Sequence, residues 1–253
     1  MKVRAFALRN IKELLRDPLS YIFCLGFPII MLVIMTFVNS SILEEAQMTI
    51  FNIDKLAPGI CVFSFTFVML FTCLQVSKDR TGAFLIRLYA SPMKPAEYIA
   101  GYTFPLIVIA LGQSIITFAV SVLICITSDV SLKFANILLS VLTLIPAVFL
   151  FMGLGLLIGS IFNEKVAPPV SSIIITLSSI IGGIWMDVEM IGGAVRNIAM
   201  AFPFYHAVKA SRAALSGNYS DIVAPLLIVI LFAAAVYITA IIIFKYKMKS
   251  DVK

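Results

Sequence analysis

The sequence predicts an all-α integral membrane protein with six transmembrane helices, an N-terminal interfacial helix, and a re-entrant or external helical segment between helices 5 and 6. Composition is the first reason: of 253 residues, 61% are hydrophobic and 13% are charged, with a mean hydropathy of +1.08. A soluble domain is typically ~25% charged, so lipid is the expected solvent. The apolar runs are also long and uniform, which favours helices over the alternating strands of a barrel.

Six apolar runs each approach the roughly 20 residues that a helix needs to cross a bilayer. They cover residues 19–38, 57–76, 99–127, 137–162, 166–183 and 222–244. No small-residue cleavage site closely follows the first run, so we expect it to remain as a span rather than to be removed as a signal peptide.

Most of the 19 Lys and Arg residues fall in the N-terminal segment, in residues 77–98 and in the C-terminal tail. The positive-inside rule therefore predicts that both termini and residues 77–98 lie in the cytoplasm. We expect a multi-pass protein of the bacterial cell membrane. Topology and anionic headgroups account for the net charge of +6, so we expect membrane lipid as a partner and no nucleic acid.

Residues 1–18 predict an amphipathic helix before the first span. Phe6, Ala7 and Leu14 fall on one face, and basic residues on the other. Pro18 should end this helix, because proline lacks an N–H and disfavours helix at the preceding residue. An interfacial elbow helix that also touches a cytoplasmic partner and a simple membrane anchor are both compatible with this pattern.

Residues 77–98 predict a cytoplasmic loop between the second and third spans. The loop carries four basic residues, a turn at Thr81-Gly82, an amphipathic stretch at 84–89, and prolines at 92 and 95. We expect it to protrude from the membrane and to be moved by a separate protein. The alternative is that its basic residues hold lipid headgroups while its apolar residues lie in the interface.

The fourth and fifth spans form a predicted hairpin with a short turn. Gly155 and Gly159 give a G-x-x-x-G pattern, which permits close helix approach within one chain or between two chains. Ser172, Thr176 and Ser179 form a hydroxyl stripe along the fifth span. Such a stripe either packs against another helix or lines a transport pathway, and the sequence leaves both open.

Residues 184–221 are too polar to span and predict an external or re-entrant segment with short helices at 194–200 and 207–215. Its His206, the only histidine, is expected to be structural. The four cysteines all lie in or beside apolar runs without a C-x-x-C motif, so they predict neither a metal site nor a disulfide framework.

No Lys, Arg, Asp or Glu falls in the central part of any predicted span, which disfavours proton-coupled and ion-coupled transporters. The sequence also has no phosphate-binding loop, H-E-x-x-H zinc motif or G-x-S-x-G elbow. We therefore expect no cofactor in this chain and no enzymatic activity of the chain by itself. Uphill transport would need energy from a partner.

One part of the loop carries a distinctive sequence pattern. It reads Asp79-Arg80-Thr81-Gly82, then Leu85-Ile86-Arg87-Leu88, then Ser91-Pro92-Met93. With six spans and a basic N-terminal helix, this resembles an ABC-2 type permease, the membrane subunit of an ATP-binding-cassette exporter. The resemblance covers essentially the whole chain, which would form a single transmembrane domain over 1–253. Family loops often carry Glu where this one has Asp79 and Arg80.

The resemblance implies two permease copies, most simply a homodimer, with cytoplasmic ABC ATPase subunits that bind ATP and Mg²⁺. It also implies that the loop couples to the ATPase through the residues Asp79, Arg80, Gly82, Phe84, Leu85, Arg87, Leu88 and Pro92. The apolar spans suit a hydrophobic or amphipathic cargo, such as a drug or an antimicrobial or amphipathic peptide. A membrane scaffold or pore-forming subunit without coupled transport is the alternative.

Overall fold

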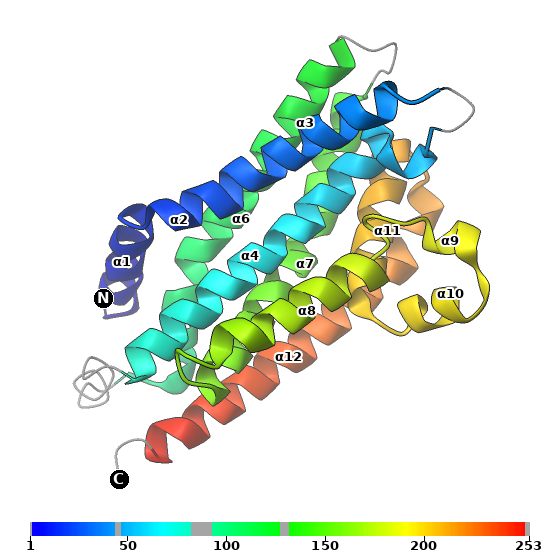
Figure 1. Ribbon diagram of the computed structural model, residues 1–253. Helices are drawn as coiled ribbons and strands as arrows, with labels where there is room; N and C mark the ends of the chain where they lie inside the picture. The colour runs from blue at the N-terminus through cyan, green and yellow to red at the C-terminus, as the bar shows by residue number, and fades with distance from the viewer. Residues whose placement is uncertain (1, 44–46, 82–92, 127–131, 251–253) are drawn as a thin grey trace.

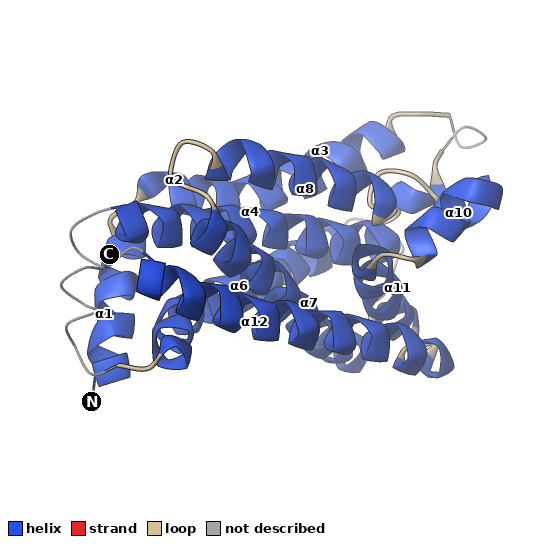
Figure 2. Cartoon of the chain, turned by 90° about the horizontal axis from the view of Figure 1, so that it is seen from below, coloured by secondary structure: helices blue, strands red, loops and turns tan. Residues whose placement is uncertain are grey.

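The computed structural model describes residues 2–43, 47–81, 93–126 and 132–250, and within these ranges it is helical, with no strands. The helices form an elongated bundle (Figure 1). Both termini lie at one end, here called the terminal end, and α9 (Val188–Ile191) and α10 (Gly193–Met200) lie at the opposite end (Figures 1 and 2). The all-helical membrane architecture predicted from composition is confirmed.

The first span follows a short amphipathic helix, α1 (Lys2–Leu15). Asp17 caps the next helix by accepting from the backbone N–H of Leu19, and α2 (Pro18–Tyr21), η1 (Ile22–Gly26) and α3 (Phe27–Ser40) then run on continuously. The π-helical turn η1 precedes Pro28, which has no N–H to give to the regular helical ladder. Helix α1 ends at Leu15 and the next helix begins at Pro18, so the break lies where the sequence predicts it.

Helix α4 (Ile53–Thr81) is the centre of the bundle and is buried along most of its length. It packs against α3, α6 (Pro95–Ile126), α7 (Phe134–Ile161), α8 (Ala167–Ile181) and α11 (Pro203–Ser216). Because its sequence is apolar on all sides, a position surrounded by other helices is the favourable one.

Gly155 and Gly159 of α7 lie directly against α4. A Cβ added at Gly159 would lie 2.7 Å from the Cys73 carbonyl oxygen, and one added at Gly155 would clash with the Met69 carbonyl. Both glycines are thus used for helix packing within the chain, one of the two roles that the G-x-x-x-G pattern allows.

Five helices among the described residues are long and apolar enough to cross a membrane. They are Pro18–Ser40, Ile53–Thr81, Pro95–Ile126, Phe134–Ile161 and Tyr219–Lys247. The predicted fifth span, 166–183, corresponds to α8, which has only 15 residues. At 1.5 Å per residue it is about 22 Å long, against about 30 Å for the hydrocarbon core. The sixth span therefore stays a prediction.

The segment between α8 and α12 (Val223–Ser250) forms α9, α10, α11 and the turn η4 (Tyr219–Asp221). Helix α11 is largely buried against α7, α12 and α4. Arg212 ties it to α4 by donating from Nε to the Lys55 carbonyl at 2.9 Å. The two short helices expected in this region are present, and the second begins earlier, at Pro203.

Candidate functional site

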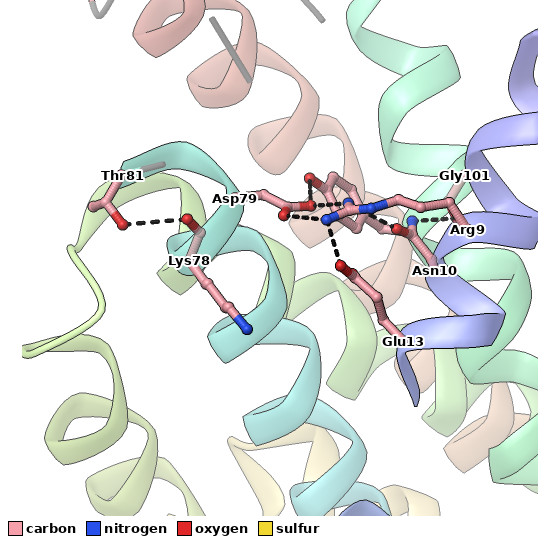
Figure 3. Close-up of polar contacts among 8 residues, drawn as sticks. Arg9, Asn10, Glu13, Lys78, Asp79, Thr81 and Gly101 are labelled. Carbon is pink, nitrogen blue, oxygen red and sulfur yellow. Dashed lines mark hydrogen bonds and ion pairs between the residues drawn. The ribbon is translucent and has the colours of Figure 1, made fainter. Parts of the chain in front are cut away.

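The C-terminal end of α4, which lies at the terminal end of the bundle, is joined to α1 by a partly buried ion pair. Arg9 donates from Nη1 to Asp79 Oδ2 at 2.6 Å and from Nη2 to Oδ1 at 2.8 Å (Figure 3). Tyr102 also donates to Oδ2, at 2.8 Å. Asp79 is only 5% exposed. Burial disfavours the charged guanidinium, but the hydrogen bonds and charge of Asp79 outweigh it and raise the pKa of Arg9. The pair is charged and geometrically specific.

Helix α1 is also seated on α6. Asn10 is fully buried and donates from Nδ2 to the Gly101 carbonyl at 3.0 Å (Figure 3). Phe6 packs edge-on against Tyr98 and Tyr102, with ring centroids 5.8 and 4.9 Å apart, and a Cβ at Gly101 would clash with its ring. The amphipathic helix is therefore fastened to the spans by specific contacts, in addition to any contact with lipid.

Arg80 holds the same end of α4 to α7. It donates from Nη1 to the Gly159 carbonyl at 3.2 Å and to the Ser160 carbonyl. These carbonyls belong to the last turn of α7, where helices leave carbonyl groups unsatisfied and carry negative partial charge. The consecutive residues Asp79 and Arg80 thus connect α4 to three other helices, Asp79 to α1 and α6 and Arg80 to α7.

The predicted loop boundaries of 77–98 differ from the structure. Residues 77–81 continue α4, since Asp79 and Arg80 gain partners there and Thr81 donates to the Ser77 carbonyl at 3.0 Å. Residues 95–98 begin α6, capped by Glu97 accepting from the Lys94 N–H at 2.6 Å. The other predicted coupling residues, Gly82, Phe84, Leu85, Arg87, Leu88 and Pro92, lie outside the described residues.

Each hydroxyl of the predicted stripe on α8 donates to a backbone carbonyl of its own helix. Ser172 donates to Pro168 at 3.0 Å, Thr176 to Ser172 at 3.0 Å, and Ser179 to Thr176 at 2.9 Å. Ser172 and Thr176 are exposed on the surface of the single chain, whereas Ser179 is buried. Two of the three are therefore open to lipid, to water or to a second protein.

A second charged cluster lies at the opposite end. Glu189 accepts from Arg196 at 2.7 Å and Lys209 at 3.0 Å, and also from the Tyr205 hydroxyl. The bond from Tyr205 and the bond from Lys209 are the main causes that lower the pKa of Glu189 to about 2. These contacts tie α9 and α10 to the start of α11.

Sequence reasoning placed Arg9 on a polar helix face and did not single out Asn10 or Tyr102. A signal was present, because a carboxylate one turn from the end of an apolar span needs a cationic or hydrogen-bonding partner. Arg9 is such a partner, but it lies 70 residues away in the chain, and the pairing depends on how α1 folds back.

A family model described as ABC-2 type transporter matches residues 1–216 of this sequence. A comparison with curated proteins finds no match.

Proposed function

This chain belongs to the ABC-2 type transporter family, and from that premise we propose that it is the permease subunit of an ATP-driven exporter. The family is a membrane transport component that is generally not itself catalytic and normally works with an ABC ATPase partner. In this proposal two permease copies form a homodimer in the cell membrane, and both termini face the cytoplasm. The separate ATPase binds ATP and Mg²⁺.

The observation that carries the proposal is the attachment of the loop between α4 and α6. Just before the loop, Asp79 is bonded to α1 and α6, and Arg80 is bonded to α7. A force on residues 82–92 would therefore reach several helices through short, direction-specific contacts rather than through one flexible hinge. This is the mechanical property that a coupling element needs.

The ATPase would dock on the loop through the basic side chain of Arg87 and the apolar side chains of Phe84, Leu85 and Leu88. ATP binding would close the ATPase pair, shift both loops and change access to a pathway between the two permeases. The energy enters as a difference in ATP affinity between two conformations, because a ligand shifts an equilibrium only by its differential affinity.

We assign the cargo to hydrophobic or amphipathic molecules, such as drugs or antimicrobial peptides. The charged side chains on the described candidate spans are confined to the ends of those helices, as in α4, where Asp54 and Lys55 begin the helix and Lys78, Asp79 and Arg80 end it. A pathway without buried charge favours apolar cargo over ions.

The test is co-purification of the full chain with its candidate ATPase in lipid nanodiscs, for wild type, Leu85→Asp and Arg87→Glu. Both variants should lose most of the bound ATPase, because one puts a charge into an apolar contact and the other reverses a charge. Lys165→Glu is the matched control, since it reverses a basic residue in the α7–α8 turn, outside the loop.

Wild-type complexes should also show ATPase turnover that responds to one class of amphipathic compound. Full ATPase binding by both loop variants would contradict docking at this loop. Absence of any ATPase partner would favour the scaffold or pore-forming alternative.

A further inference from the structure

A cavity of about 300 Å³ at the opposite end of the bundle is lined by residues of α4, α9 and α11 and of the neighbouring turns. Half of the residues that line it are charged. Its volume is at the small end of the range for ligand pockets, so it suits a small molecule. Which molecule it suits depends on which of the charges already have partners within the chain.

One pair of these charges is satisfied internally. Glu189 accepts from Lys209 Nζ at 3.0 Å, and both residues line the cavity. Arg212 of α11, Asp54 of α4 and Asp187, which precedes α9, also line it but form no ion pair with any described residue. One cation and two carboxylates therefore remain without ionic partners.

Arg212 uses little of its hydrogen-bonding capacity. Its Nε donates to the Lys55 carbonyl at 2.9 Å. Its Nη2 is buried against Gly59 of α4, where an added Cβ would lie 3.2 Å from it. The side chain as a whole keeps some exposed surface, and Nη1 is neither buried nor hydrogen-bonded to the described residues. Nη1 is therefore the nitrogen that a ligand in the cavity can reach.

The two carboxylates act on Arg212 without pairing with it. Burial lowers the pKa of Arg212 to about 10, and the charges of Asp187 and Asp54 oppose this lowering. The guanidinium is thus charged at neutral pH and lies within electrostatic reach of both carboxylates. Asp54 has no hydrogen-bond partner among the described residues. Asp187 caps α9 through Oδ1 alone, which leaves Oδ2 available.

This arrangement favours a ligand that carries both charges. A simple anion would gain the contact with Arg212 but would meet the negative charges of Asp54 and Asp187. A simple cation would gain the carboxylates but would meet the guanidinium. A zwitterion gains both contacts, and hydrogen bonds between charged groups are stronger than those between neutral ones.

We propose that this cavity binds a small zwitterion, with its carboxylate on Arg212 Nη1 and its ammonium at the carboxylates of Asp54 and Asp187. A free amino acid and a short peptide share this chemistry. The proposal goes beyond the proposed transport function, because binding here needs no ATPase. Its failure would leave the coupling proposal unaffected.

Two variants remove the two halves of the site. In Arg212→Gln the amide nitrogen takes the place of Nε and keeps the bond to the Lys55 carbonyl, while Nη1 and the positive charge are lost. The double variant Asp54→Asn with Asp187→Asn removes both negative charges, and asparagine still caps α9 because it is as good an N-cap as aspartate. Arg196→Gln is the matched control, since it removes a cation at the same end that does not line the cavity.

The experiment is a saturation-transfer-difference NMR titration of the full chain in phosphatidylcholine nanodiscs at neutral pH, with empty nanodiscs as the blank. The probes are glycine, β-alanine and γ-aminobutyrate, whose charges lie at increasing separation. At least one of them should bind wild type and Arg196→Gln saturably, and at least about tenfold more tightly than propionate or propylammonium binds wild type. Arg212→Gln should bind that probe at least about tenfold more weakly than wild type, and the double variant should bind it no better than wild type binds propionate.

Wild type that binds none of the three zwitterions, or binds them no better than propionate, would overturn the proposal without reference to any variant. Wild-type affinity in Arg212→Gln would also overturn it. Triglycine identifies the source of the ligand in a second arm. Tighter binding of triglycine than of the best single amino acid assigns a short peptide, and weaker binding assigns a free amino acid.

Discussion

Asp79 and Arg9 form a two-point ion pair in which the carboxylate is buried and the guanidinium is partly exposed. Removing one partner of such a pair leaves the other uncompensated in a poorly solvated site. We expect Asp79→Asn to destabilise the chain by about 1–3 kcal/mol, below the value for fully buried pairs because water still reaches Arg9. Thermal unfolding in nanodiscs would measure the loss, and hydrogen exchange would locate it in α1.

Glu13 provides the control for that pair, because it also accepts from Arg9, at 2.6 Å, but is exposed. Glu13→Gln should change stability by no more than about 0.5 kcal/mol. Equal effects of the two variants would mean that the pair with Asp79 does not hold α1. The double variant Arg9→Met with Asp79→Leu should recover part of the loss, since it leaves no unpaired charge.

Glu189, at the opposite end of the bundle, leads to a prediction of how stability depends on pH. Its folded-state pKa is lowered from 4.5 to about 2, so its stabilising contribution is complete above 4.5 and is lost as the pH falls toward 2. Acid should therefore loosen α9 and α10 from α11 in that window. Trp185, the only tryptophan, precedes α9 and would report the change by its fluorescence.

In the variant Glu189→Gln the transition between pH 4.5 and 2 should be absent, because the titrating group is gone. A wild-type transition that persists in this variant would assign it to another carboxylate, for which Asp187→Asn is the comparison. Asp187 caps α9 by accepting from the Glu189 and Met190 backbone N–H groups.

At the scale of the helices, the α4–α7 contact depends on glycine at two positions. Gly155→Ala should destabilise the chain by about 1–3 kcal/mol, because the added methyl group meets backbone atoms of α4 that cannot rotate away. Gly112→Ala on α6 is the matched control, since its Cβ would have nothing within 4 Å. The control should be neutral or stabilising by up to about 1 kcal/mol. Unfolding midpoints of the two variants would measure these changes. A similar loss of stability in both would contradict the close approach of α7 to α4.

Helices whose apolar runs are long were predictable because a bilayer requires about 20 apolar residues for a span. The helix break at Pro18 was predictable for an equally local reason, because proline lacks an N–H and disfavours helix at the preceding residue. The end of helix α8 was harder to predict, because the predicted apolar run continues past the last helical residue, Ile181, into Gly182 and Gly183.

The end of α4 depended on distant partners of Asp79 and Arg80, which local patterns do not contain. The start of α6, by contrast, has a local signal, because Glu97 lies three residues after Lys94 and accepts from its N–H.

At the scale of the whole molecule, the family and the membrane architecture were readable from composition, span pattern and the loop motif together. The candidate site was only partly readable. The residues flanking the loop could be picked out, but their partners come from α1, α6 and α7, far away in the chain. Sequence patterns assigned Asp79 and Arg80 to contacts with another protein, whereas in the structure both make contacts within the chain.

The exposed hydroxyls of α8 allow a test of how two copies meet. If Ser172 and Thr176 line an aqueous pathway between permeases, cysteines at these positions should react with a membrane-impermeant maleimide. The neighbouring Ile173, which is 61% exposed, should resist labelling as Ile173→Cys if its face meets lipid. Wild type gives a low background, because all four native cysteines are buried. Equal resistance of all three variants would place the stripe against protein or lipid, and a pathway would then have to run along another helix.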